Sequence, residues 1–531
     1  MRIRPAEIAL ALALAVAIGW PTVATVAQAL RAGDTATSRA GGQGRPFRLA
    51  METARLVFAT EAIALPIGLP LALVLFRTDL WGRRVVLGWM AVSAFVPMPL
   101  LATAWLGALG NAGRASAFGT GPILSGWAGA AFVHAMASIP WIVLLAGVGL
   151  RAVEPELEEA ALLDMPAWRV LARVTLRRSV GALAASAVAV AVLTAGDMTV
   201  TDLLQVRTYA EEAYLRYSLG DDSGAAAVAL PSLVVFGGLI LLAARGLLRN
   251  DPAKLVSKAA RARTWRLGGW RVPLGLAVAA TSGGLVLLPI YGLFEWAGRV
   301  GGAAALGMPP RWSVAGLLGT LRASGVEAVG PLFVSVGWSA LGASTTVALA
   351  WPLAWFGRRS IPWRGAALAC AALTLATPGP VVGMGLVLAY REVPWAYGSA
   401  LMLVHADLLR TLPYALLLLW PSLRAIPPEY LDAAALDGSG EWGRIRRLAL
   451  PLTRDATIAA WGVAFVLALG ELPATNLVYP PGVMPLSVLI WSLLHSGVES
   501  HLAGVALVML AVVAAAGLPT AWALRRLEPP G

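Results

Sequence analysis

Long runs of apolar residues, separated by short polar loops, recur along the whole chain. The core of a bilayer requires about 20 apolar residues per helix, and lipid offers no hydrogen-bond partner, so each run is expected to be an α-helix. The pattern predicts about twelve membrane-spanning helices. They fall at residues 6–30, 55–76, 85–109, 127–150, 179–196, 224–245, 272–294, 329–356, 366–389, 399–420, 455–473 and 502–524.

The composition agrees with a polytopic membrane protein. The 531 residues are 58% hydrophobic and 13% charged, about half the charged fraction of a soluble domain. The net charge of +12 does not indicate nucleic-acid binding, because the arginines gather in alternate loops, as orientation signals do. The first run is longer than the apolar region of a signal peptide, which has about 7–15 residues, so we expect a retained span.

The two halves of the chain share a sequence pattern. Leu69-Pro70-Leu71-Ala72 corresponds to Trp351-Pro352-Leu353-Ala354, and Phe132-Val133-His134-Ala135 corresponds to Leu403-Val404-His405-Ala406. Six spans in each half imply parallel repeats about an axis along the membrane normal. We expect a first half at 1–249, a basic cytoplasmic linker at 250–271 that lies against anionic headgroups, and a second half at 272–531.

Each half carries an arginine-rich loop between its fourth and fifth spans, at 151–178 and 421–454, and both loops hold one degenerate motif. The second copy is Asp432-Ala433-Ala434-Ala435-Leu436-Asp437-Gly438, followed after nine residues by Leu448-Ala449-Leu450-Pro451. The first is Glu159-Ala160-Ala161-Leu162-Leu163-Asp164, followed by Val174-Thr175-Leu176, without the glycine and the proline. In the second copy the glycine permits a sharp turn and the proline ends a helix, so this loop is expected to contain two short helices. The first loop is expected to contain two short helices as well, because it carries the same motif in degenerate form.

This pair of loops resembles the EAA loop of binding-protein-dependent ABC-importer permeases, by which the membrane subunit docks on its ATPase. The resemblance implies an all-α polytopic membrane protein with the type I ABC-importer permease fold, its two six-helix halves fused in one chain. It places the protein in a bacterial plasma (inner) membrane, and the positive-inside bias puts both termini in the cytoplasm. The ATPase-coupling residues it implies are Glu159, Ala160, Ala161, Asp164, Asp432, Ala433, Ala434, Gly438, Leu448, Leu450 and Pro451.

The resemblance also implies the partners. These are two copies of an ABC ATPase subunit, a periplasmic or lipid-anchored substrate-binding protein, and membrane lipid. The sequence has no Gly-rich phosphate-binding loop ending in Gly-Lys, so ATP is expected on the partner subunits and no cofactor on this chain. No nucleophile–base arrangement indicates an enzyme, and no metal site is expected.

Prolines within the spans are candidates for the translocation path. Pro97 and Pro99 in the third span correspond to Pro378 and Pro380 in the ninth. A proline frees backbone carbonyls, which a membrane helix tolerates beside protein or a water-filled path. The alternative is a kink that serves packing only.

Acidic residues at the span ends give a second set of candidates. Asp197 and Glu471 end the fifth and eleventh spans, where they would form an acidic pair that favours cations, unless each caps the next helix. Asp407 and Arg410, one helical turn apart, are expected to neutralise each other. His134 and His405 are expected to form hydrogen bonds between helices.

Fused permeases of this kind resemble ferric-iron and thiamine importers. Since the acidic pair favours a cationic substrate, ferric iron is the first expected substrate. Thiamine or a polyamine comes next, followed by sulfate or molybdate. A secondary transporter of the major facilitator type is the alternative from another class, since it also has twelve spans in two parallel repeats. The segment 77–84 is similar to its loop between spans two and three, but that class does not need the long loops at 151–178 and 421–454.

Overall fold

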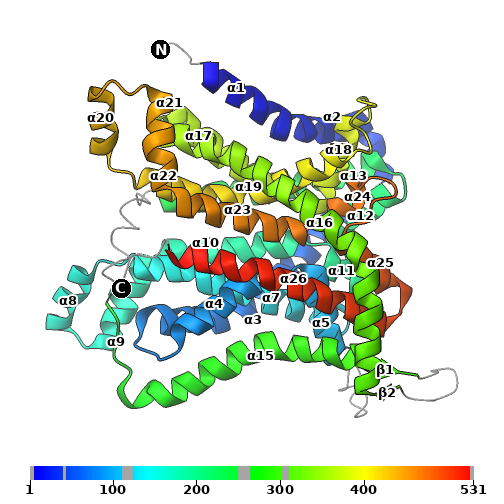
Figure 1. The fold of residues 1–531 in the computed structure, drawn as a ribbon, viewed down its shortest axis with the longest axis horizontal. Coiled ribbons are helices and arrows are strands. Elements are labelled where there is room, and N and C mark those ends of the chain that lie inside the picture. Colours follow the sequence, from blue (N-terminus) through cyan, green and yellow to red (C-terminus); the bar gives the residue numbers. More distant parts are fainter. Residues whose placement is uncertain (1–4, 40–43, 111–123, 249–262, 302–309, 527–531) are drawn as a thin grey trace.

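The computed structural model describes residues 5–39, 44–110, 124–248, 263–301 and 310–526, and nearly all of them are helical (Figure 1). Among these residues nine helices are long and apolar enough to cross a membrane, or up to twelve if each of three bent pairs counts as one span. The prediction of an all-α polytopic protein is therefore confirmed.

The first half extends from α1 to α13. Its elements are α1 (Pro5–Leu14), η1 (Ala15–Gly19), α2 (Trp20–Arg39), α3 (Gly44–Arg77), α4 (Arg83–Ala94), α5 (Met98–Leu109), α7 (Gly126–Arg151), α8 (Pro155–Asp164), α9 (Ala167–Val170), η2 (Leu171–Thr175), α10 (Leu176–Gly196), α11 (Thr199–Leu203), α12 (Tyr209–Ser218) and α13 (Asp222–Leu248).

The second half repeats this order and adds a short antiparallel hairpin after its first span. Its elements are η3 (Gly268–Trp270), α15 (Arg271–Ala297), β1 (Arg299–Val300), β2 (Arg311–Trp312), α16 (Val314–Gly357), α17 (Ile361–Ala376), α18 (Gly379–Tyr390), α19 (Ala400–Arg424), α20 (Pro428–Leu436), α21 (Glu441–Arg444), η5 (Ile445–Ala449), α22 (Leu450–Leu452), α23 (Arg454–Leu469), α24 (Thr475–Val478), α25 (Leu486–Ser496) and α26 (Glu499–Arg526).

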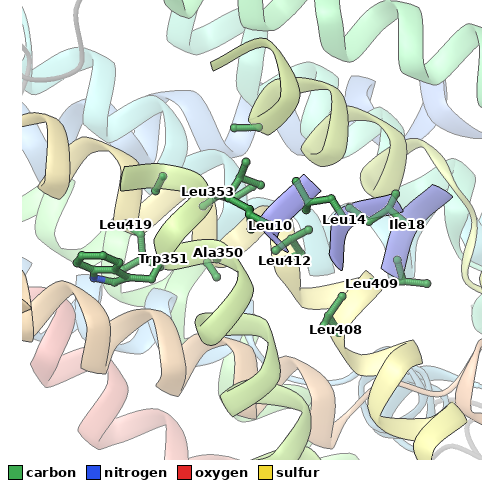
Figure 2. Packing of buried hydrophobic residues seen from close by; sticks show 14 of the residues in the cluster. Leu10, Leu14, Ile18, Ala350, Trp351, Leu353, Leu408, Leu409, Leu412 and Leu419 are labelled. Atoms are coloured by element: carbon green, nitrogen blue, oxygen red, sulfur yellow. The ribbon is translucent and has the colours of Figure 1, made fainter. Parts of the chain in front are cut away.

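The halves exchange their first helices. Helix α2 packs on α18 and α1 on α16 of the second half, while α15 packs on α4 and α5 of the first half (Figure 1). Leu10, Leu14 and Ile18 enter the buried cluster of the second half next to Leu409 and Leu412 (Figure 2). Burial of large aliphatic side chains there stabilises the exchange by about 1.5–3 kcal/mol each.

The third and ninth spans are not continuous helices with a kink. Helices α4 and α5 meet at 108°, and α17 and α18 meet at 106°. Pro97 is extended, with ψ 142°, and Pro99 stands in the first turn of α5. A proline disfavours helical backbone in the residue before it and cannot donate to the preceding turn, so two prolines this close stop one helix and start another.

Two further differences concern lengths and extra helices. Helix α16 has 44 residues, longer than the span expected at 329–356. The short helices α11–α12 and α24–α25 follow the fifth and eleventh spans, where we expected only loops. Both sets lie at the end of the molecule opposite α8 and α20 (Figure 1).

Residues 249–262, most of the expected linker, lie outside the described residues. The part that follows is fastened to the turn between α3 and α4. The Trp265 N–H donates to the Arg77 carbonyl at 2.7 Å, and the Leu267 N–H donates to Asp79 Oδ1 at 3.0 Å. The segment 77–84 thus binds the stretch of chain that leads into the second half.

Candidate coupling surface and translocation path

A buried ion pair holds α8 of the first motif loop. Both carboxylate oxygens of Glu158 accept from the guanidinium of Arg77, at the end of α3, and the Thr175 hydroxyl donates to the same carboxylate. Neither charged side chain is accessible to solvent. Arg77 also donates to the Leu150 carbonyl at 3.0 Å, so the ends of α3, α7 and α8 are joined at one point.

The second loop is held by apolar contacts at the equivalent positions. Leu431 takes the place of Glu158 and Ala449 takes that of Thr175, and both are buried. Beside them the Arg358 guanidinium stacks over Trp355, 4.4 Å from the ring centroid. Burial, reinforced by the charges of neighbouring arginines, lowers the pKa of Arg358 to about 10, so it remains charged at neutral pH.

The residues predicted for coupling lie on the two loops at the same end of the molecule (Figure 1). The acidic residue of the first motif, Glu159, is 64% exposed and lies 3.8 Å from Arg263, whereas its neighbour Glu158 is the buried acid. Gly438 has φ +78°, a left-handed conformation that favours glycine. Of the other residues, Ala160, Asp164, Asp432, Ala433, Leu450 and Pro451 are exposed, and Ala161, Ala434 and Leu448 are half-buried.

The most exposed apolar side chains of these loops are residues that the motif did not single out. Leu163 is 87% exposed and Trp168 65%, while Leu436 is 89% exposed and Trp442 71%. Leu163 and Leu436 occupy the same motif position, and a tryptophan follows each of them across the turn. Matching exposed pairs at two symmetric sites are typical of a surface that a partner covers. The signal in the sequence was a leucine followed by a tryptophan in both loops, five residues later in the first and six in the second.

The helix breaks of the two halves meet near the middle of the molecule. A β-carbon placed on Gly470, at the end of α23, would overlap Cγ of Pro97 in the first half. At the equivalent place, a β-carbon on Gly196 would lie 3.9 Å from Cα of Pro378 in the second half. The structure therefore brings the Pro-x-Pro segments, predicted for the path as kinks and found as helix breaks, together with the ends of the fifth and eleventh spans, each across the interface between halves.

Asp197 and Glu471 are buried beside these contacts and cap the short helices that follow. Asp197 Oδ2 accepts from the Val200 N–H at 2.9 Å. The Glu471 carboxylate accepts from the Ala474 and Thr475 N–H groups at 3.0 and 2.8 Å. The capping interpretation thus has direct support in the geometry, and a role in a cation path stays a prediction.

The expected pair of Asp407 and Arg410 is wrong. Arg410 Nε lies 3.6 Å from Glu471 Oε1, and its Nη1 donates to the Thr377 carbonyl at 3.2 Å. Asp407 points to α16, where a β-carbon on Gly342 would come within 2.7 Å of its Oδ2. The partner of Arg410 belongs to a span distant in sequence, so spacing along one helix could not reveal it.

The two histidines, His134 and His405, differ in their hydrogen bonds. His405 forms the expected hydrogen bonds between helices, because its ring nitrogens contact the Tyr390 hydroxyl at 2.9 Å and the Ala17 carbonyl at 2.6 Å. His134 Nε2 lies 3.6 Å from Asp197 Oδ2 and has no hydrogen-bond partner among the described residues. The prediction is confirmed for His405 only.

At the end opposite the motif loops, the two halves are in direct contact through their short helices. The Asn476 amide of α24 donates to the Tyr214 hydroxyl of α12 at 3.1 Å, and the Tyr214 ring packs edge-on against Trp491 of α25. His495 Nε2 lies 3.2 Å from Asp202 Oδ2. Side chains of α12 and α25 also share one buried cluster with Met198 and Leu472, which precede α11 and α24.

The close contact between the halves leads to a paired prediction. The Gly470→Ala variant should lose stability by about 1–3 kcal/mol, because the added methyl group overlaps the rigid Pro97 ring. The equivalent Gly196→Ala variant should be nearly neutral, since its methyl group has ordinary contact distance. Thermal unfolding in detergent checks both, and equal midpoints for the two variants would contradict the close approach.

Comparison with known proteins settles the class. The family described as binding-protein-dependent transport system inner membrane component matches this chain twice, at residues 64–250 and 346–530. The chain belongs to this family. One match falls in each predicted half and each contains one motif loop, so the protein is a fused binding-protein-dependent permease and the major facilitator alternative is wrong.

Relatives come from two kinds of transport system. A Salmonella paratyphi A protein, PhnV, provisionally named a 2-aminoethylphosphonate transport system permease, is 29% identical over 143 residues, which is 26% of this chain and 53% of PhnV. The Haemophilus influenzae spermidine/putrescine transport system permease protein PotC is 24% identical over 139 residues, 26% of this chain and 53% of PotC. The chain thus spans about half the length of these relatives. Neither name supports ferric iron.

Proposed function

We propose that this chain provides both halves of the membrane path of an ATP-driven importer, with one ATPase subunit docked on α8 and a second on α20. The observation that carries the proposal is the matched pair of exposed side chains, Leu163 with Trp168 and Leu436 with Trp442. In each pair the leucine lies on a short helix outside the candidate spans, α8 or α20, and the tryptophan lies at the beginning of the helix that follows. An ATPase groove that buries a leucine and a tryptophan would gain several kcal/mol from each loop, at about 1.5–3 kcal/mol per large apolar side chain.

This proposal orients the protein in the bacterial inner membrane. The end with α8 and α20 faces the cytoplasm, and the beginning of α1 and the end of α26 lie at that same end (Figure 1). The opposite end, where Tyr214 meets Asn476 and Trp491, faces the periplasm and the binding protein. Since that end is held shut between the halves, the described conformation is the one before the outer side opens.

The substrate we propose is a small amine-bearing organic solute rather than ferric iron. Both kinds of relative are named for compounds that contain amino groups, namely 2-aminoethylphosphonate and spermidine or putrescine. No group of three or more His, Cys, Asp or Glu side chains that could hold a metal ion occurs in the described part of the chain. Ferric iron is a hard cation, for which several carboxylate oxygens at one place would be the suitable ligands.

Reconstituted uptake tests the proposal. The chain and its ATPase, placed in liposomes that contain ATP, should accumulate 2-aminoethylphosphonate or putrescine when a loaded binding protein is supplied outside. We expect accumulation to stop without ATP and to be indifferent to added ferric iron. Uptake driven by an ion gradient, with no ATPase present, would refute the proposed function.

A further inference from the structure

We propose that Arg410 is the contact in the translocation path for an anionic group of the substrate, a phosphonate or a carboxylate. This inference rests on the proposed function and narrows its substrate class to amines that also carry an acid group. Arg410 lies in the middle of α19, on a helix that the chain uses to cross the membrane.

The surroundings of Arg410 place it where the halves meet. Its Nη1 is held by the Thr377 carbonyl at the break between α17 and α18, and its Nε faces Glu471 at the break between α23 and α24. One turn further along α19, the Tyr414 ring packs against Trp141 of the first half, with centroids 5.6 Å apart. Arg410 therefore lies one helical turn from a direct contact between the halves.

The charge exposed at this place is positive. The Glu471 side chain is only 5% exposed, and two backbone N–H groups together with Arg410 occupy its oxygens. Asp197 is likewise buried, and it accepts from the Val200 N–H. Arg410, by contrast, is 27% exposed, and its Nη2 has no partner among the described residues. The acids are satisfied within the protein, while donors of the arginine remain free for a solute.

The N–H groups of the Arg410 guanidinium determine which ligand chemistry fits. A guanidinium offers its N–H groups in a planar fork that fits a phosphonate or carboxylate with two parallel hydrogen bonds. The ring faces of Trp141 and Tyr414 provide the kind of surface on which an ammonium group packs. A zwitterion such as 2-aminoethylphosphonate can use both features, whereas putrescine and spermidine have no group for Arg410.

Binding to the purified complex of the chain and its ATPase, in detergent, tests the inference with 2-aminoethylphosphonate and putrescine as probes. The wild-type complex should bind 2-aminoethylphosphonate more tightly than putrescine. Arg410→Gln should weaken 2-aminoethylphosphonate binding by about 10- to 100-fold, the effect of losing hydrogen bonds to a charged group. Arg410→Lys keeps the charge without the fork and should fall between the two. Arg391→Gln is the matched control, since Arg391 is exposed beside Glu392, and it should bind like the wild type.

The outcomes separate this inference from the proposed function. Equal binding of 2-aminoethylphosphonate by the wild type and by Arg410→Gln would overturn the inference, and so would a wild-type preference for putrescine. In both cases a chain that still copurifies with its ATPase leaves the proposed function standing. If Arg410→Gln fails to fold, as judged by its unfolding midpoint without ligand, Arg410→Lys alone decides, and unchanged affinity in that variant overturns the inference.

Discussion

Replacing both Leu163 and Leu436 with arginine is expected to abolish association with the ATPase. These two side chains are the most exposed leucines of the motif loops. Burial of each in a partner is worth about 1.5–3 kcal/mol, so loss of both should weaken binding by roughly 100-fold or more before the cost of burying the new charges is added. Insertion in the membrane should be unaffected, because both residues lie outside the spans.

The single variants sharpen this expectation. Leu163→Arg should release one ATPase subunit and Leu436→Arg the other, each with loss of transport. Leu219→Arg is the control, because Leu219 is 76% exposed but follows α12 at the opposite end of the molecule. Copurification with a tagged ATPase measures all four proteins, and full recovery of ATPase by the double variant would show that the ATPase docks elsewhere.

Removing the buried carboxylate of the first loop is expected to have the largest effect on stability. Glu158→Ala leaves the Arg77 guanidinium buried without its counter-ion, and breaking such a pair costs about 3–5 kcal/mol. The neighbouring Glu159→Ala variant removes an exposed pair with Arg263 and should cost less than about 1 kcal/mol. Thermal unfolding midpoints compare the two, and similar midpoints would contradict a structural role for Glu158.

The second half suggests a rescue. It holds its loop with Leu431 and Ala449, where the first half uses Glu158 and Thr175. Apolar replacement of a whole buried ion pair is often neutral or stabilising. Arg77→Met combined with Glu158→Leu should therefore be more stable than Glu158→Leu alone, and a double variant no better than the single one would argue against the pair as the cause.

Much of the fold follows from hydropathy. The spacing of apolar runs and the repeated motifs predicted the spans, the two halves and the position of both loops, because each depends on local composition. The exchange of α1 and α2 with α15 was not predictable in this way. The exchange depends on which half buries Leu10 and Leu14. Hydropathy cannot predict this, because it does not distinguish the apolar surface of one half from that of the other.

The candidate site was harder to predict for similar reasons. Glu158 and Glu159 are adjacent acids, and only the rotation of α8 about its axis decides which one is buried. Arg410 pairs with Glu471 from another span rather than with Asp407 one turn away. The two Pro-x-Pro segments indicated a kink within one span, but the bend of more than 100° between two helices accompanies packing of α5 and α18 on helices of the opposite half.

The central claim is that one chain carries two ATPase docking sites, and the mass of the intact complex tests it most directly. Native mass spectrometry of the detergent-purified chain with its ATPase should give one chain with two ATPase subunits, and one subunit fewer when either Leu163 or Leu436 is arginine. A wild-type complex with a single ATPase subunit, or a chain that transports without any, would contradict the claim.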